Sequence, residues 1–408
     1  MKCGLLGRKL SHSYSPQIHS MLGDYPYELF ETEPDHLESF LKNGDFTGIN
    51  VTIPYKKDVI PYLDELSPVA QKLGAVNTII KRRDGSLFGH NTDYAGFHAM
   101  VKNCGISVGG KKILVLGSGG ASNTATAVLE ELGGDVTVIS RSGKNTYDTI
   151  HRHSDAAMIV NTTPVGMFPN TGSSPVDLSC FPKLEAVLDV IYNPARTKLL
   201  LDAESRGLVT ENGLRMLVAQ AKEAAEYFTE NTIPDDRIQQ IHKTLSRQME
   251  NIILIGMPGC GKSTVGKLLA EQCGKTFVDA DAEIIALAGK SIPEIFAESS
   301  ESGFRLLETK VLDTLGKQSG LVIATGGGCV TQVCNYPLLH QNGHIFWLKR
   351  PLDLLPTEGR PLSQSKSLVG MYTARKPLYN AFSDHAVDNS GTPNDTIARI
   401  LSLLEEME

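Results

Sequence analysis

The stretch that most constrains this chain is a glycine-rich loop set between an apolar run and a helical pattern. Residues 256–264 read G-M-P-G-C-G-K-S-T and fit the pattern G-x-x-x-x-G-K-[ST]. The run Ile252–Ile255 predicts a buried strand before the loop, and Val265–Gln272 predicts a helix after it. Strand, glycine loop and helix form a phosphate-binding P-loop, because backbone N–H groups and the positive end of the helix dipole then face the phosphate. The loop therefore predicts a nucleotide-binding α/β domain that begins near residue 249.

The P-loop also assigns chemistry to its own residues. Lys262 is expected to reach the β- and γ-phosphates of a nucleotide, and the Ser263 hydroxyl is expected to hold Mg²⁺. The other residues expected to contact the nucleotide are Gly259, Cys260, Gly261 and Thr264. A nucleotide with β- and γ-phosphates, together with Mg²⁺, is therefore the expected ligand of this domain.

Length and charge limit the other classes of protein that the chain can belong to. Its 408 residues are enough for two or three domains. A net charge of −7 argues against nucleic acid as the main partner, because binding the phosphate backbone needs a basic face. No apolar run reaches the roughly 18–20 residues of a membrane span, and no basic-then-apolar leader opens the chain. We expect a cytoplasmic protein with no nucleic-acid and no membrane partner; a homo-oligomer is compatible with the sequence but nothing in it indicates one.

The first ninety residues alternate short apolar runs with helical patterns, which is typical of an α/β fold. The predicted strands are Lys2–Gly7, Tyr27–Glu31 and Gly48–Val51, and the predicted helices are Pro16–Leu22 and Asp35–Lys42. Polar clusters stand at the ends of the strands: H-S-Y-S-P from residue 12, N-V-T-I-P-Y-K from residue 50, A-V-N-T from residue 75 and N-T-D from residue 91. Singly, each cluster also fits an ordinary helix cap or turn. Together they predict a site for a small polyhydroxylated acid, because ligands of open α/β sheets bind beyond the ends of strands.

A second glycine-rich turn follows the apolar run Lys111–Leu116. The turn reads G-S-G-G-A-S over residues 117–122, and it is followed by a predicted helix over Asn123–Leu132 and a predicted strand over Asp135–Ile139. This β-α-β order predicts a Rossmann dinucleotide-binding domain. The loop residues expected to contact the dinucleotide are Gly117, Ser118, Gly119, Gly120 and Ala121.

The residues after the second strand of this unit predict which dinucleotide is bound. NAD-binding proteins usually place a carboxylate at this position, whereas this chain has S-R-S. A carboxylate would repel a 2′-phosphate, while Arg and Ser side chains bind one, so we predict NADP(H). The residues expected to hold the 2′-phosphate are Ser140, Arg141, Ser142 and Lys144. The alternative is that Arg141 is an ordinary solvated residue.

The order H-S-x-S-P, N-V-T-x-P-x-K, A-V-N-T, N-T-D and the glycine loop resembles the shikimate dehydrogenase family, from the first strand to about Tyr227. The resemblance implies that Lys56 and Asp93 form the catalytic pair, and a lysine beside a carboxylate can stabilise a developing alkoxide and protonate it. It implies substrate contacts for Ser13, Ser15, Thr52, Lys56, Asn77, Asp93, Tyr192 and Gln220, and cofactor contacts for Val190 and Gly213. Tyr94 stands where the family has Gly, which leaves the local backbone geometry open.

The second domain resembles shikimate kinase over essentially its whole length. The resemblance rests on the D-A-D after the predicted strand Thr276–Val278, on G-K-S-I-x-E-I-F from Gly289, and on the three glycines after the predicted strand Leu321–Thr325. It implies that Asp279 lies near Mg²⁺ and that Asp281 holds the substrate hydroxyl and is the candidate base. It also implies that the substrate carboxylate contacts Arg305, Gly327 and Arg375, and that the lid residue Arg360 closes on the transferred phosphate.

Together the two resemblances predict a bifunctional enzyme, because the product of the first reaction is the substrate of the second. NADPH would reduce 3-dehydroshikimate to shikimate, and MgATP would phosphorylate shikimate to shikimate 3-phosphate. The predicted divisions are 1–95 for substrate binding, 96–220 for the Rossmann domain, 221–248 for closing helices and 249–408 for the kinase. Two alternatives stay open. In the first alternative, the kinase half is a catalytically weak or regulatory module, because its lid between Leu348 and Tyr372 is short. In the second, the dehydrogenase half prefers quinate as its substrate or NAD as its cofactor.

Overall fold

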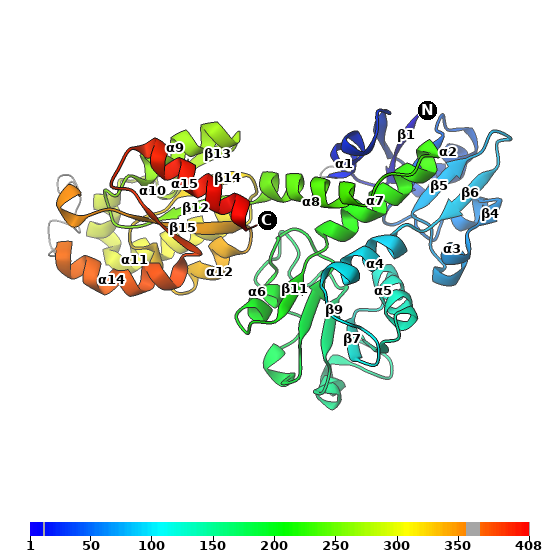
Figure 1. The fold of residues 1–408 in the computed structure, drawn as a ribbon, viewed down its shortest axis with the longest axis horizontal. Helices are drawn as coiled ribbons and strands as arrows, with labels where there is room; N and C mark the ends of the chain where they lie inside the picture. The colour runs from blue at the N-terminus through cyan, green and yellow to red at the C-terminus, as the bar shows by residue number, and fades with distance from the viewer. Residues whose placement is uncertain (11–12, 356–367, 408) are drawn as a thin grey trace. The chain divides into compact units, whose positions relative to one another are not determined.

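The computed structural model describes residues 1–10, 13–355 and 368–407, and the chain divides into two compact units. Unit 1 comprises Met1–Gly166, Ser173–Tyr192 and Leu199–His242, and unit 2 comprises Met167–Gly172, Asn193–Lys198 and Lys243–Glu408. Both units are built from sheets covered by helices (Figure 1), which confirms the predicted α/β class. Within the described ranges, no helix has the length and apolar character needed to cross a membrane.

The N-terminal sheet of unit 1 has six strands in the order β2-β1-β3-β5-β6-β4. The strands are β1 (Cys3–Gly7), β2 (Tyr27–Glu31), β3 (Gly48–Val51), β4 (Glu65–Leu66), β5 (Thr78–Lys81) and β6 (Leu87–His90), and the helices are α1 (Ser15–Leu22), α2 (Leu37–Asn43) and α3 (Pro68–Leu73). The three predicted strands are therefore confirmed. The helix predicted over Asp35–Lys42 begins with a separate 3₁₀ turn, Pro34–His36, as is common at helix N-termini.

The direction of β5 explains why Asn77 lies with the other polar clusters. We expected Asn77 at the end of a strand, and this is wrong, because it immediately precedes β5. Strand β5 runs antiparallel to β3, with Thr78 opposite Asn50, so the start of β5 and the end of β3 share one edge of the sheet. Asn77 thus reaches the predicted edge from the opposite chain direction.

The second sheet of unit 1 is fully parallel, in the order β8-β7-β9-β10-β11. Its strands are β7 (Lys112–Leu116), β8 (Asp135–Ile139), β9 (Met158–Asn161), β10 (Ala186–Asp189) and β11 (Val209–Glu211). Helices α4 (Asp93–Asn103) and α5 (Gly120–Glu131) cover one face, and α6 (Lys198–Glu204) covers the other (Figure 1). The strand order reverses between β7 and β9, which is where dinucleotides bind in doubly wound sheets. Helix α5 begins at Gly120, three residues before its predicted start.

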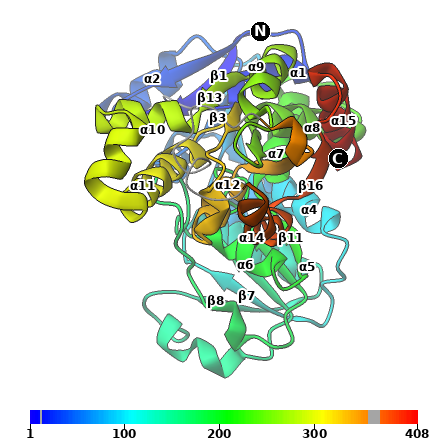
Figure 2. The same cartoon turned by 90° about the vertical axis from the view of Figure 1, so that its left-hand side faces the viewer.

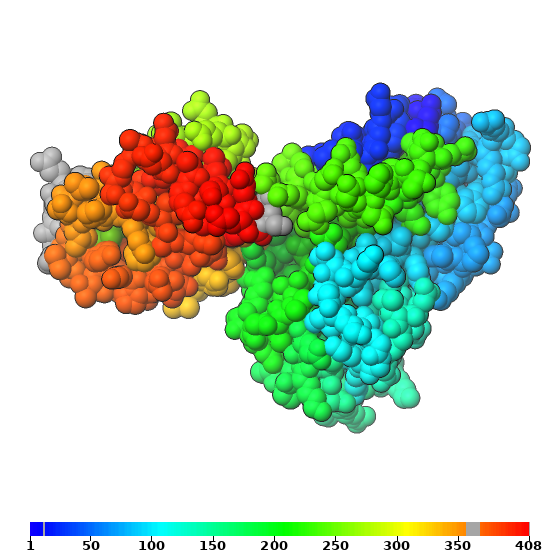
Figure 3. Space-filling view, in the orientation of Figure 1, coloured from blue at the N-terminus to red at the C-terminus, as the bar shows by residue number. Residues whose placement is uncertain are grey.

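Helix α7 (Leu214–Thr229) returns from the second sheet to the first, where it packs on α1 and α4. A Cβ atom on Gly96 of α4 would lie 2.7 Å from the carbonyl oxygen of Met216, so the two helices approach closely at this glycine. Helix α8 (Asp236–Met249) follows, and only Glu250 separates it from the next strand, so the connector is shorter than predicted. Parts of both helices reach the molecular surface, as the green atoms in Figure 3 show.

Unit 2 is a five-stranded parallel sheet in the order β13-β14-β12-β15-β16. The strands are β12 (Asn251–Ile255), β13 (Thr276–Asp279), β14 (Leu321–Ala324), β15 (Gly343–Lys349) and β16 (His385–Asp388). Helices α9 (Lys262–Cys273) and α15 (Pro393–Glu406) lie on one face, and α11 (Ile292–Gly316), α12 (Asn335–His340) and α14 (Leu368–Phe382) lie on the other (Figure 1). Figure 2 shows α10 (Ala280–Ala288) between β13 and α11.

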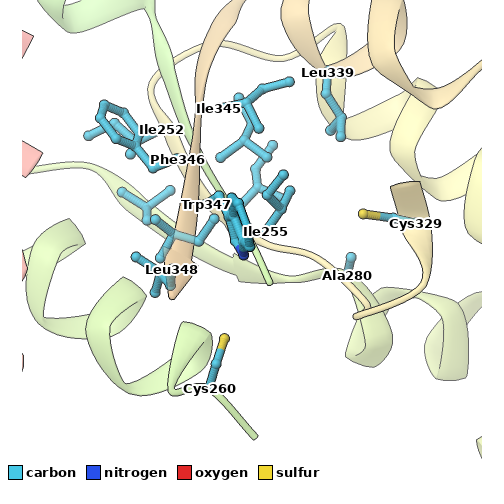
Figure 4. Packing of buried hydrophobic residues seen from close by; sticks show 14 of the residues in the cluster. Ile252, Ile255, Cys260, Ala280, Cys329, Leu339, Ile345, Phe346, Trp347 and Leu348 are labelled. Carbon is cyan, nitrogen blue, oxygen red and sulfur yellow. The ribbon is translucent and has the colours of Figure 1, made fainter. Parts of the chain in front are cut away.

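The core of unit 2 forms around the two central strands. Ile255 of β12 pairs in register with Trp347 of β15, and both side chains are buried among apolar neighbours (Figure 4). Strand β12 is buried at every position, as predicted from its apolar run, since both faces of a parallel sheet are covered by helices. The P-loop begins at Gly256, directly after β12. Its first residue is therefore attached to a buried strand in the core of unit 2.

Candidate active sites

The centre of the candidate site in unit 1 is an ion pair between Lys56 and Asp93. Lys56 follows β3, and Asp93 is the first residue of α4. The lysine Nζ donates a hydrogen bond to Asp93 Oδ2 at 2.6 Å, and the two side chains are 29% and 17% exposed. Asn91 Oδ1 accepts from the backbone N–H of Asp93 at 3.1 Å, which orients the first turn of α4. The pair is thus held in place but still open to a ligand.

Asn77 and Gln220 meet beside this pair, although 143 positions separate them in the chain. Asn77 Nδ2 donates to Gln220 Oε1 at 3.5 Å, and Asn77 Oδ1 accepts from the backbone N–H of Thr92 at 2.7 Å. The Thr92 hydroxyl donates to Gln220 Oε1 at 3.3 Å. Helix α7 therefore brings Gln220 to the sheet edge where Asn77 and Asp93 lie.

The remaining predicted substrate residues of unit 1 come from α1, β3 and the segment after β10. Ser13 Oγ accepts from the backbone N–H of Ser15 at 3.2 Å at the start of α1, and Thr52 directly follows β3. The ring of Tyr14 meets that of Tyr192 edge-on, with 6.1 Å between centroids. Burial raises the pKa of the Tyr192 hydroxyl, so this group is neutral at physiological pH.

A buried polar network beneath these residues was not predicted from the sequence. The Tyr27 hydroxyl donates to Asn50 Oδ1 at 2.7 Å, and Asn50 Nδ2 donates to Thr78 Oγ1 at 3.1 Å. His19 stacks on Tyr27 with 3.9 Å between ring centroids, and burial lowers the pKa of His19 to about 3. The network supports the edge that carries Asn77. Of the residues in this network, Asn50 belongs to the N-V-T cluster singled out in the sequence.

The glycine loop after β7 fits the phosphates of a dinucleotide. Gly117 has a φ of +112°, and a Cβ atom there would lie 2.8 Å from Thr162 Oγ1, so this position needs glycine. At Gly119 and Gly120, apart from the chain neighbours and the nearby backbone of α5, no atom of the described residues would lie within 4 Å of a Cβ atom, which leaves room for a ligand. Ser118 is exposed and Ala121 is half-buried at the start of α5.

The residues predicted to bind the 2′-phosphate lie together just after β8. Arg141, Ser142 and Lys144 are exposed, and the Ser140 hydroxyl donates to the backbone carbonyl of Ser142. A flexible, exposed cation suits a phosphate group, and none of the four predicted residues is an acid. The backbone of Val190, another predicted cofactor residue, approaches Gly213 so closely that a side chain on Gly213 would clash with the Val190 carbonyl.

Tyr94 takes an ordinary helical conformation inside α4, of which Asp93 is the first residue. Its hydroxyl donates to Glu131 of α5, and the Lys72 ammonium lies 5.7 Å from its ring centroid. Burial and the Glu131 carboxylate raise the pKa of Tyr94 to about 12. The larger side chain therefore links α3, α4 and α5.

The P-loop of unit 2 has the conformation that its glycines permit. Gly256, Gly259 and Gly261 have φ values of 146°, 85° and 100°, which side chains disfavour. Lys262 is 8% exposed, and its ammonium donates to the carbonyls of Gly256 at 3.0 Å and Met257 at 3.1 Å. Cys260 is buried within the loop, and its carbonyl accepts from Asn389 Nδ2, a support that the sequence did not predict.

Ser263 and Asp279 form an oxygen site next to the P-loop. The Ser263 hydroxyl donates to Asp279 Oδ2 at 2.7 Å. A hydroxyl and one carboxylate are hard oxygen ligands that fit Mg²⁺, which usually keeps waters and nucleotide oxygens in its remaining positions. Among the described residues, no group of three or more His, Cys, Asp or Glu side chains forms a metal cluster, in keeping with such a sparse site.

A cavity of about 700 Å³ joins the P-loop to the predicted substrate residues of the kinase. Its lining includes Thr264, Asp279, Asp281, Arg305, Gly327 and Arg375. Arg305 Nη1 donates to Glu308 Oε2 at 2.7 Å, and Glu308 is fully buried. Burial raises the pKa of Glu308 to about 7, against the opposing effect of the Arg305 charge. Glu308 was not predicted as a site residue, although it stands three positions after Arg305 on α11.

The three glycines after β14 form the floor of this cavity. Arg375 Nη1 donates to the Gly327 carbonyl at 3.0 Å. A Cβ atom on Gly327 would lie 2.7 Å from Pro258 of the P-loop, and one on Gly328 would collide with the Arg305 guanidinium. The loop is therefore in tight contact with both the P-loop and the Arg305 guanidinium. The predicted lid residue Arg360 lies outside the described residues.

Fold and site geometry define an enzyme with two parts, a Rossmann-type dehydrogenase and a P-loop phosphotransferase. Comparison with known proteins agrees. The family model for shikimate dehydrogenase substrate binding domain matches residues 5–79, and the model for shikimate kinase matches residues 258–405. The shikimate dehydrogenase (NADP(+)) of Clostridium perfringens is 35% identical over 264 residues, which are 59% of this chain and 97% of that protein.

Solved structures give the same result for the N-terminal part. Shikimate 5-dehydrogenase from Thermus thermophilus, in complex with NADP(H) and shikimate, matches with 31% identity and a TM-score of 0.54, over 60% of this chain and 99% of that one. Quinate dehydrogenase from Corynebacterium glutamicum, in complex with NAD, matches with 29% identity and a TM-score of 0.55, over 60% and 98%. The chain belongs to the shikimate dehydrogenase family, and it carries a shikimate kinase domain after the dehydrogenase. At the level of these families, the predicted enzyme classes and the cofactors NADP(H), ATP and Mg²⁺ are confirmed.

Proposed function

We propose that this chain catalyses two consecutive reactions: the NADPH-dependent reduction of 3-dehydroshikimate to shikimate, and the MgATP-dependent phosphorylation of shikimate to shikimate 3-phosphate. The observation that carries the second step is the cavity that places Arg305 and Arg375 opposite the P-loop. Two arginines suit a carboxylate, and the P-loop suits a nucleotide, so one cavity fits both substrates of a shikimate kinase.

In the dehydrogenase, NADPH supplies the hydride when bound. Lys56 then stabilises the negative charge that develops on the carbonyl oxygen and transfers a proton to it. Asp93, 2.6 Å from the lysine, holds the Lys56 ammonium in place through their hydrogen bond. Asn77 and Gln220 hold the ring hydroxyls, and Ser13 and Ser15 hold the carboxylate. The exposed Arg141 and its neighbours select NADPH through the 2′-phosphate.

In the kinase, Asp281 holds the attacking hydroxyl and accepts its proton, while Arg305, Arg375 and the Gly327 backbone hold the carboxylate. Lys262 leaves its present carbonyl partners for the β- and γ-phosphates. Ser263 and Asp279 would hold Mg²⁺, which would supply positive charge to offset that of the phosphates. Positioning and charge stabilisation of this kind supply most of the catalysis in phosphoryl transfer.

The proposed domain boundaries remain 1–95 for substrate binding, 96–220 for the Rossmann domain, 221–248 for the closing helices and 249–408 for the kinase. The enzyme is proposed to be cytoplasmic.

The deciding experiment is ADP release by the purified full chain with MgATP, with and without shikimate. ADP that depends on shikimate, and that disappears in Arg305→Met, supports the kinase. Dehydrogenase activity without ADP above background would instead favour the alternative that unit 2 is a regulatory nucleotide-binding module. Comparing NADPH with NADH, and shikimate with quinate, tests the other alternative, which the resemblance to the NAD-bound quinate dehydrogenase keeps open.

A further inference from the structure

The Gly327 carbonyl accepts two hydrogen bonds in the floor of the kinase cavity. One comes from Arg375 Nη1 at 3.0 Å, and the other comes from the hydroxyl of Tyr379, one turn further along α14. A carbonyl oxygen has two lone pairs, so these two donors saturate it. Because the peptide group is planar, the direction of this carbonyl also sets the direction of the Gly328 N–H.

Tyr379 itself cannot act by touching the substrate. Its side chain is fully buried, and it is absent from the lining of the cavity. Its ring stacks on Trp347, with 5.6 Å between ring centroids, and its hydroxyl lies 3.9 Å from Met257 Sδ in the P-loop. Burial raises the pKa of Tyr379 well above its usual range, so the hydroxyl keeps its proton and remains a donor.

The loop on which Tyr379 acts is restrained on its other sides as well. Pro258 packs against Gly327, and the Arg305 guanidinium packs against Gly328. Arg375 has two tasks, since it lines the cavity and also donates to the Gly327 carbonyl. Without a second donor on that carbonyl, Arg375 alone would have to hold the loop while it binds an anion.

We propose that Tyr379 is a positioning residue of the kinase, which holds the Gly326–Gly328 loop in the conformation that binds the substrate carboxylate and leaves Arg375 available for that anion. The inference rests on the proposed kinase function and adds to it. It predicts an effect on shikimate binding that is separate from nucleotide binding, since the Gly327 carbonyl that Tyr379 holds also accepts from Arg375, a proposed ligand of the substrate carboxylate.

The test is Tyr379→Phe in the full chain, with Tyr336→Phe, a half-buried tyrosine of α12 outside the lining of the cavity, as the matched control. Loss of one buried hydrogen bond should raise the KM for shikimate about five- to tenfold, with the KM for ATP unchanged. The control should match the wild type. Dehydrogenase activity of the same preparations measures the amount of folded chain. Equal KM values for shikimate in Tyr379→Phe and wild type would overturn the proposal, as would a parallel rise in the KM for ATP.

Two further measurements keep the inference separate from the proposed function and from folding. If the wild type releases no ADP with shikimate, the kinase function fails, but shikimate binding can still be measured by the fluorescence of Trp347, the single tryptophan. An unchanged affinity in Tyr379→Phe would then overturn the positioning role. If Tyr379→Phe does not fold, amide hydrogen exchange in the wild type decides. Slow exchange of the Gly326–Gly328 amides is expected, and exchange at the rate of a free loop would contradict the proposal.

Discussion

Lys56 Nζ lies 2.6 Å from Asp93 Oδ2, although one residue follows a strand and the other opens a helix. Strands β5 and β6 make this contact possible. Strand β5 runs antiparallel to β3 and β6 runs antiparallel to β5, so β6 ends at the same edge of the sheet as β3, and Asp93 follows there. An ammonium group so placed can protonate an alkoxide and be held in place by its carboxylate partner. The first prediction follows from this pair.

Lys56→Ala should lower kcat for reduction by about 10²–10⁴-fold, the usual range for loss of a general acid. Phosphorylation should be unaffected, since Lys56 belongs to unit 1. The measurement is NADPH oxidation with 3-dehydroshikimate, beside ADP release from the same sample. Lys57→Ala, one position further and exposed, is the control and should behave as wild type. Reduction that survives in Lys56→Ala would rule out the assigned role.

Arg141→Ala should weaken NADPH binding and leave NADH binding unchanged. The exposed guanidinium follows β8 and is proposed to bind the 2′-phosphate, which NADH lacks. Loss of a charge-assisted hydrogen bond of about 1.5–3 kcal/mol corresponds to roughly a 10- to 100-fold rise in the KM for NADPH. Arg152→Ala, another exposed arginine of unit 1, serves as the control. A KM that rises equally for both cofactors would show that Arg141 does not read the phosphate.

Tyr94→Gly, which restores the residue of the family, should destabilise unit 1 by about 1–2 kcal/mol, from the low helix propensity of glycine and the lost contacts. The lost contacts are the bond to Glu131 and the ring beneath Lys72. Tyr94→Phe keeps the ring and should cost less than about 1 kcal/mol. The urea concentration at which dehydrogenase activity is half lost measures both effects. An unchanged midpoint in Tyr94→Gly would mean that the link among α3, α4 and α5 adds no stability.

Glu308 should make shikimate binding depend on pH near neutrality. Its pKa is raised from 4.5 to about 7 by burial, so it is charged above about pH 7 and neutral below. A neutral Glu308 removes one negative charge beside Arg305, whose guanidinium also pairs with Glu301 at 3.2 Å. The attraction of Arg305 for an anion is then stronger, so the KM for shikimate should fall as the pH falls from 8 to 6. In Glu308→Gln the KM should not change over this range. A wild-type KM that is flat, or that rises on acidification, would contradict this.

The same shift has a consequence for folding. Because the folded-state pKa of Glu308 is raised, its contribution to the stability of unit 2 is fully present below about pH 4.5 and is lost as the pH rises through about 7. Glu308→Gln should therefore remove this part of the pH dependence of the unfolding free energy. Urea unfolding followed by Trp347 fluorescence at several pH values measures it, since Trp347 is buried in the core of unit 2.

The P-loop, the glycine loop after β7 and most strands could be predicted from the sequence, because they depend on local patterns: apolar runs, glycines that permit unusual φ values, and one arginine in place of an acid. Resemblance then supplied the partners, such as Lys56 with Asp93. Which distant groups meet could not be predicted and became visible in the folded chain. The tertiary structure placed Asn77 at the start of an antiparallel strand, Glu308 in a fully buried pair with Arg305, Tyr94 against Glu131, and Tyr379 on the Gly327 carbonyl. The physical reason is that burial, and the satisfaction of a carbonyl or a charge by a remote donor, depend on how helices pack onto sheets and leave no periodic signal in the sequence.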